Sequence, residues 1–77
     1  MSQNLDVRHL PAPEPMVRIL EAVATLFPGE TLQVRHSRVP HLLYPRLQER
    51  GVAVETRELP DGEVLLSIRR PERPATS

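Results

Sequence analysis

The stretch that decides the fold lies at residues 5–16 and reads LDVRHLPAPEPM. Its first four residues, Leu5–Arg8, alternate apolar and polar side chains, which is typical of a half-buried β-strand. Pro11, Pro13 and Pro15 then alternate directly before a run with helical periodicity. Proline suits the first turn of a helix, because its φ is fixed near the helical value and it has no N–H that needs an acceptor. The stretch therefore predicts a strand, a proline-rich turn and a helix start.

The same turn is the first candidate binding site. The first four N–H groups of a helix have no acceptor inside it, and if the helix begins near Pro13, only those of Glu14 and Met16 need one from outside. Glu14 also places a negative charge at the positive end of the helix dipole. The turn is thus either a well-built helix start or an anion-binding or partner-binding site at the mouth of the helix. The candidate residues are His9, Pro11, Ala12, Pro13, Glu14 and Pro15.

The next two elements follow from the spacing of apolar residues. Apolar side chains recur with the helical period over Glu14–Phe27. Pro28 and Gly29 should end this helix, since proline cannot continue it and glycine suits the left-handed position after its last turn. Alternating residues then predict a second strand over Thr31–His36.

The second half of the chain predicts a short helix and a hairpin. Pro45 would remove a backbone hydrogen bond from a helix that started as early as His41, so we expect an irregular first turn and a regular helix from about Tyr44 to Arg50. The dipeptide Asp61-Gly62 is a strong hairpin signal. The hairpin strands are expected at Val52–Glu58 and Glu63–Arg70.

The predicted order of elements is β-α-β-α-β-β, which indicates an α+β fold. Four strands with one apolar face each, together with two helices, form a two-layer α/β sandwich in which both helices lie on one face of a four-stranded mixed sheet. Residues 1–4 are expected to form a flexible N-terminus and residues 5–70 a single domain. Residues 71–77, which are rich in proline and polar side chains, are expected to form a disordered tail.

The strand and turn at residues 5–15 resemble the opening of the TusA/SirA/YeeD-like sulfur-carrier superfamily. The resemblance rests on Leu5-Asp6-Val7-Arg8, on Leu10 and on Pro13-Glu14-Pro15, and the segment Pro28–Leu32 looks like the helix-to-strand turn of that superfamily. It covers about residues 5–70 and is closest to a cysteine-less bacterial branch classed as a domain of unknown function. The resemblance implies the same two-layer fold.

One departure from the superfamily pattern determines the chemistry. A sulfur carrier holds its persulfide on a cysteine at the helix N-terminus, where the dipole favours the thiolate. The resemblance places that cysteine at Ala12 and a glycine at His9, and the chain contains no cysteine at all. Alanine has no nucleophile, so the sequence excludes persulfide transfer by this chain.

Composition excludes several other classes of function. Ten basic and ten acidic residues among 77 give a formal charge of zero, whereas general nucleic-acid binding requires a basic excess. The aromatic residues, Phe27 and Tyr44, lie on predicted helices, so the sheet face lacks stacking platforms for single strands. No apolar run approaches the ~20 residues that span a membrane. We therefore expect a cytoplasmic protein without nucleic-acid or membrane partners.

Three histidines suggest an alternative site. His36 ends the second predicted strand and His41 precedes the second helix, an arrangement that forms ligand sites in other α/β proteins. Together with His9 they are the candidate ligands of a metal or haem. Their spacing matches no zinc motif, and zinc needs three or four protein ligands. We therefore expect no cofactor, and three histidines that titrate independently near the ordinary value of ~6.5.

The leading hypothesis is a non-enzymatic, TusA-like module that binds a protein partner through the mouth of the first helix. No nucleophile motif, glycine-rich phosphate loop or pair of carboxylates indicates an enzyme. The alternatives are a small-ligand, metal-binding or haem-binding accessory domain linked to redox metabolism, and an accessory domain active only beside another chain. The outward sheet face is a further candidate protein surface. Its charged residues are Asp6, Arg8, Arg35, Glu55, Arg57 and Arg69.

Overall fold

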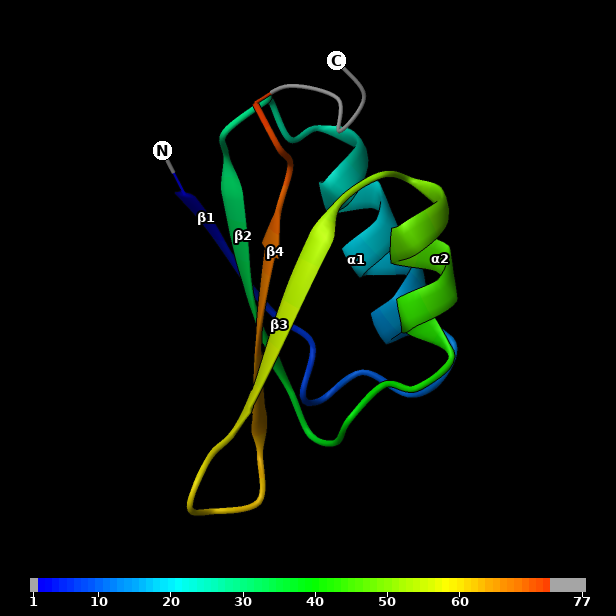
Figure 1. The fold of residues 1–77 in the computed structure, drawn as a ribbon. Helices are drawn as coiled ribbons and strands as arrows, with labels where there is room; N and C mark the ends of the chain where they lie inside the picture. Colours follow the sequence, from blue (N-terminus) through cyan, green and yellow to red (C-terminus); the bar gives the residue numbers. More distant parts are fainter. Residues whose placement is uncertain (1, 73–77) are drawn as a thin grey trace.

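The computed structural model describes residues 2–72 and has the four strands and two helices in the predicted order (Figure 1). The second strand has the predicted bounds, and the second helix begins, as expected, only after an irregular turn. Residues 73–77 of the predicted tail lie outside the described residues. The elements are β1 (Ser2–Asp6), α1 (Glu14–Ala24), β2 (Thr31–His36), α2 (Leu43–Glu49), β3 (Ala53–Glu58) and β4 (Val64–Arg69).

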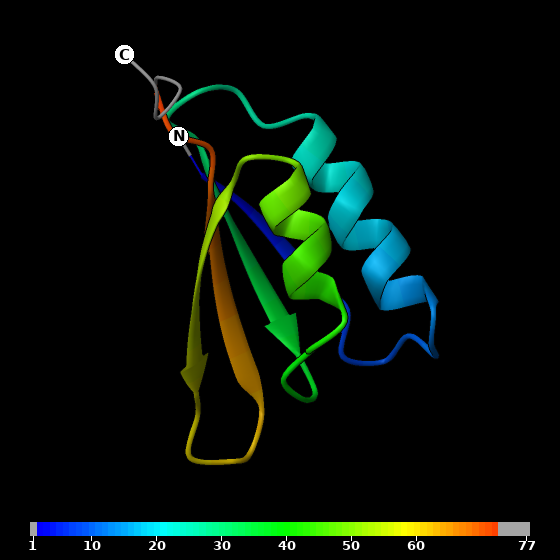
Figure 2. The same cartoon turned by 45° about the vertical axis from the view of Figure 1, so that its right-hand side comes forward.

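The strands form one mixed sheet in the order β1-β2-β4-β3. β1 is parallel to β2, and β4 is antiparallel to both β2 and β3. Both helices lie on the same face of this sheet, and the other face is open (Figure 2). The predicted two-layer sandwich is therefore confirmed.

The core lies between the sheet and the two helices and is built from alternate residues of the strands. In β2 and β4, every second side chain points toward the helices, as the period of a strand requires. The buried residues of β2 are Leu32, Val34 and His36, and those of β4 are Val64, Leu66 and Ile68. Ile19 and Val23 of α1 and Leu43 and Leu47 of α2 cover them. Among residues 2–72, His36 is the one buried residue with a polar side chain.

The first strand begins earlier than predicted. It spans Ser2–Asp6 rather than Leu5–Arg8, because Ser2–Asp6 pairs with Thr31–Arg35 of β2. The Arg8 backbone N–H donates to the Asp6 carboxylate at 3.1 Å, a local turn that takes the chain out of the sheet after Asp6. The predicted boundary at Leu5 was wrong, since the residues before it belong to the sheet.

The first helix ends three residues before the predicted end at Phe27. The N–H groups of Thr25 and Leu26 donate to the carbonyls of Ala22 and Val23, three residues back, and this tighter turn ends the helix at Ala24. Phe27 therefore lies outside the helix and is 73% exposed.

The end of α1 is held by the last strand. The Arg70 guanidinium, just after β4, donates to the Val23 carbonyl at 3.0 Å, and the Gly29 N–H donates to the Arg70 carbonyl at 2.7 Å. The Arg70 Nε is buried and has no partner among the described residues. This side chain places a positive charge at the negative end of the helix dipole.

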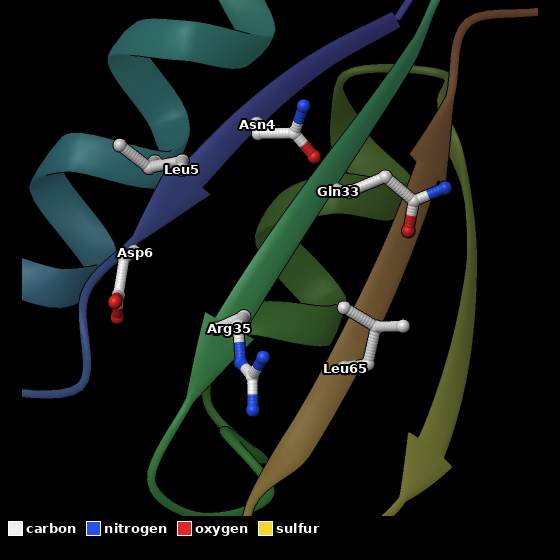
Figure 3. Close-up of a pocket in the computed structure, with 6 residues that line it drawn as sticks. All are labelled: Asn4, Leu5, Asp6, Gln33, Arg35 and Leu65. Carbon is white, nitrogen blue, oxygen red and sulfur yellow. The ribbon is translucent and has the colours of Figure 1, made fainter.

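The open face of the sheet carries a network of charged side chains. The Arg8 guanidinium donates to the carboxylates of Asp6 and Glu63, and Arg35 donates to the same Glu63 at 3.1 Å. Hydrogen bonds from Arg8 hold the pKa of Asp6 well below its ordinary value. Asp6, Arg8 and Arg35 were predicted on this face, whereas Glu63 was not. Figure 3 shows Arg35 between Asp6 and Leu65 at a shallow pocket on this face.

Candidate functional site

A groove lies where the N-terminal end of α1 approaches the end of β2 and the segment before α2. It holds about 440 Å³ and is lined mainly by apolar side chains. Three segments that are distant in the sequence meet there, namely residues 12–19, His36 and residues 38–43. The lining residues are Ala12, Pro13, Pro15, Met16, Ile19, His36, Arg38, Val39, Pro40, His41, Leu42 and Leu43.

The proline-rich turn contributes half of its predicted site residues to the groove. Ala12, Pro13 and Pro15 line it. His9, Pro11 and Glu14 are exposed and are not part of its lining. The structure thus divides the six candidate residues into three that line the groove and three on the surface outside it.

The start of α1 is closed by the backbone of the turn. Pro13 is the N-cap residue, and no side chain caps the helix. The Glu14 N–H donates to the Pro11 carbonyl at 2.9 Å, which supplies one of the two outside acceptors that the sequence required. The Ala12–Pro13 peptide bond is cis.

Two of the three histidines lie at the groove. His36 and His41 line it, whereas His9 does not. Within residues 2–72, no three histidine, cysteine or acidic side chains come close enough together to hold a metal ion. The three candidate ligands therefore do not come together, and the histidines of the groove lining are His36 and His41.

His36 is buried and neutral. It is 7% exposed, and its Nδ1 accepts the backbone N–H of Arg38 at 3.3 Å, which places the ring proton on Nε2. Burial, with a further contribution from the Arg38 charge, lowers the pKa of His36 below its ordinary value of 6.5. The expectation that all three histidines titrate near ~6.5 was therefore wrong for His36, because a buried ring loses the hydration that favours its charged form.

The irregular turn before α2 sets the position of His41 and Leu42. The His41 N–H donates to the Val39 carbonyl, and the Leu43 N–H to the Pro40 carbonyl at 2.9 Å. The Tyr44 ring contacts the His41 ring edge-on, with 6.4 Å between centroids. Its hydroxyl forms a 2.6 Å hydrogen bond with the Thr56 hydroxyl of β3, which holds α2 to the sheet.

Leu42 is the residue of the groove that sequence reasoning missed most clearly. It lines the groove but is 79% exposed, while the adjacent Leu43 is fully buried. The apolar pattern could not separate the two leucines, because periodicity carries no information inside an irregular turn. Leu42 extends the apolar lining of the groove onto the exposed surface, and contiguous exposed apolar surface is typical of interaction sites.

The groove combines an apolar lining with a few polar side chains. Its charged or titratable side chains are His36, Arg38 and His41, and its lining includes no acidic residue. It also includes no serine, threonine or cysteine that could act as a nucleophile. The groove is therefore suited to an apolar side chain with a carboxylate next to it.

Comparisons with known proteins agree with the fold. Residues 4–70 match the family model described as "Uncharacterized conserved protein (DUF2249)". The crystal structure of the SirA-like protein from Desulfitobacterium hafniense is similar with a TM-score of 0.79 and 23% identity, over 94% of this chain and 100% of that chain. The search of the curated proteins found no match. In the described part of the chain, no helix has the length and apolar character needed to cross a membrane.

Proposed function

Since this chain belongs to the DUF2249 family of uncharacterised conserved proteins, we propose its function from the groove: it is a non-enzymatic module that binds a partner protein at the mouth of α1. The observation that carries the proposal is Leu42, which is 79% exposed at the rim of an apolar, solvent-open groove. Burying such a side chain against a partner removes apolar surface from water, which is the main driving force of protein association.

The charge of the groove supports a partner segment of defined chemistry. Arg38 provides a positive charge and hydrogen-bond donors, and the lining holds no carboxylate to neutralise that charge. Arg38 is exposed and suited to a bidentate bond with a carboxylate. The partner would therefore insert an apolar side chain and place an acidic residue or a C-terminal carboxylate beside Arg38.

The proposal includes the absence of a catalytic role. This part of it rests on the residue at the start of α1, Ala12. Ala12 lies where the resemblance to sulfur carriers places their cysteine, and the sequence contains no cysteine anywhere. The groove would thus retain the partner-binding half of a carrier site without the group that carries sulfur.

A second candidate function is favoured by the two histidines of the groove. His36 and His41 could bind a small ligand, a metal or haem, in line with an accessory role in redox metabolism. An NMR titration with zinc, nickel, iron(II) or haem separates the two functions. Sub-micromolar binding that shifts His36 and His41 together would favour this second function over the first.

Site-specific cross-linking tests the leading proposal. A photoreactive benzoylphenylalanine at Leu42 should cross-link to a partner protein in cells of the source organism. The matched control is the same residue at Phe27, which is 73% exposed but lies outside the groove lining. We expect a discrete cross-linked product from position 42 and none from position 27.

Two variants then measure how much the groove contributes to the affinity for that partner. Leu42→Asp should weaken binding of the cross-linked partner at least about tenfold, as loss of a buried leucine implies. Phe27→Asp should leave the affinity unchanged. Equal cross-linking from both positions, or equal affinities of the two variants, would contradict the proposal.

A further inference from the structure

The second feature that points to a partner is the outer edge of β3. The strand order β1-β2-β4-β3 leaves β3 bonded to β4 on one side only. Figure 2 shows β3 at the rim of the sheet, with both helices on the opposite side of the view. Except for Val54, which is half-buried, every residue of β3 is exposed.

The direction of the free backbone groups follows from the hairpin. The Leu59 N–H donates to the Glu63 carbonyl at 2.8 Å, so this pair is hydrogen-bonded. Bonded and non-bonded pairs alternate along an antiparallel ladder. Arg57, Glu55 and Ala53 therefore bond to β4, and the N–H and C=O groups of Val54, Thr56 and Glu58 point outward. No hydrogen bond from another segment within residues 2–72 reaches them.

The side chains between these groups carry opposite charges. Glu55 and Arg57 both point to the open face, and both are exposed. In the part of the chain that the structure describes, neither forms a salt bridge or a side-chain hydrogen bond. If a second copy is turned by 180° so that its β3 runs antiparallel to this one, the acid of each strand faces the base of the other. The two edges are then complementary in charge.

We infer that β3 pairs with β3 of a second copy of this chain, antiparallel and centred on Thr56. In this register, Thr56 lies opposite Thr56, and Val54 lies opposite Glu58 of the second copy. Each of the three outward-facing residues then donates its N–H and accepts at its C=O. Glu55 lies opposite Arg57 of the second copy, twice, in the non-bonded pairs whose Cα atoms are closest, at about 4.5 Å.

The charges also exclude the neighbouring registers. Centring the pair on Glu55 would place the two Glu55 side chains opposite each other, and centring it on Arg57 would do the same with the two arginines. Like charges directly opposite are destabilising. Charged side chains on an edge strand commonly prevent association. Here the charges alternate in sign, so that of these three registers only the one centred on Thr56 places opposite charges together.

The pairing is independent of the proposed function. No residue of β3 lines the groove, so a dimer would extend the sheet and leave both grooves accessible. Edge pairing buries a small area, which predicts a weak dimer rather than an obligate one. Its exposed ion pairs should also make it weaker at high salt.

Sedimentation equilibrium at low salt, from micromolar to millimolar protein, tests the inference. The unaltered protein should show a monomer–dimer equilibrium. Arg57→Glu or Glu55→Arg alone should lower the association constant at least about tenfold, because two attractive pairs become two repulsive ones. The double variant E55R/R57E should restore it to within about threefold. The control is Arg69→Glu, an exposed charge on β4, which should have little effect.

A backbone variant tests the hydrogen bonds. Glu58→Pro removes an outward N–H, which an edge strand tolerates without loss of the fold, and it should abolish dimerisation while the circular dichroism spectrum is retained. Amide exchange at Val54, Thr56 and Glu58 should slow as protein concentration rises. A protein that stays monomeric at millimolar concentration, or a dimer that survives both single charge reversals, would overturn the inference.

Discussion

At the scale of single residues, Ala12 and His36 determine what the groove can do. Ala12 contributes a methyl group and no reactive atom, and His36 contributes a ring whose pKa burial lowers. The sequence alone indicated the first of these, because the absence of cysteine can be read directly. The alternation of residues also predicts that His36 shares a strand face with Leu32 and Val34. It does not predict how deeply His36 is buried, because that depends on how the helices cover β2.

A cysteine introduced at Ala12 should be unusually acidic. The position directly precedes the N-cap of α1 and shares the groove with Arg38, and both the helix dipole and the positive charge favour a thiolate. We expect the Ala12→Cys thiol to have a pKa below the ordinary ~8.5, measured from the pH dependence of its alkylation by iodoacetamide. The matched control is Ala24→Cys at the C-terminal end of the same helix, whose thiol should titrate at or above ~8.5. Identical pKa values for the two thiols would contradict this account.

The buried His36 predicts that stability falls on mild acidification. Its pKa is lowered in the folded state, so between that value and the unfolded value of 6.5 the unfolded chain binds more protons. The free energy of unfolding should therefore decrease as pH falls from about 7.5 to 5.5, measured by urea denaturation. His36→Asn, which keeps an acceptor near the Arg38 N–H, should flatten this dependence. His41→Asn at an exposed position should not, and equal slopes in the two variants would show that another group is responsible.

At the scale of elements, the two ends of α1 are stabilised in different ways. Its start depends on neighbouring prolines and a local bond to Pro11, so the sequence predicted it. Its end depends on the Arg70 guanidinium, which lies forty-seven residues away from the carbonyl of Val23. Sequence periodicity predicted the bounds of β2 and, to within one residue, the strands of the hairpin, because alternation along a strand is local information. The start of β1 was missed because its pairing with β2 sets it, and the end of α1 was missed because a tighter last turn, held by Arg70, ends the helix early.

Arg70 should contribute measurably to the stability of α1. Arg70→Met keeps most of the aliphatic side chain but removes the bond to the Val23 carbonyl and the charge at the helix C-terminus. We expect a loss of about 1 kcal/mol in the free energy of unfolding, measured by urea denaturation. Arg69→Met, at the exposed neighbouring position, should cost much less. The explanation fails if the two variants are equally stable.

At the scale of the whole molecule, two layers leave one face of the sheet uncovered and leave β1 and β3 as edge strands. The order of elements was enough to predict the layers, because four half-apolar strands and two amphipathic helices have few other arrangements. The groove could not be predicted as a unit, since residues 12–19, His36 and residues 38–43 meet only when both helices are in place. The proposed contacts at the groove and at β3 lie on separate parts of the surface, so one protein partner and a second copy can bind at once.

The position of β4 also determines how this chain folds. β4 lies between β2 and β3 and is the strand that joins them. A chain that ended at Gly62 would lack the strand that joins β3 to β2, together with the core residues Val64, Leu66 and Ile68. The β2–β4 and β3–β4 pairs can therefore form only when β4 is present. Folding should therefore be slow for a chain of this size and strongly cooperative, because long-range contacts form only after a large loss of chain entropy.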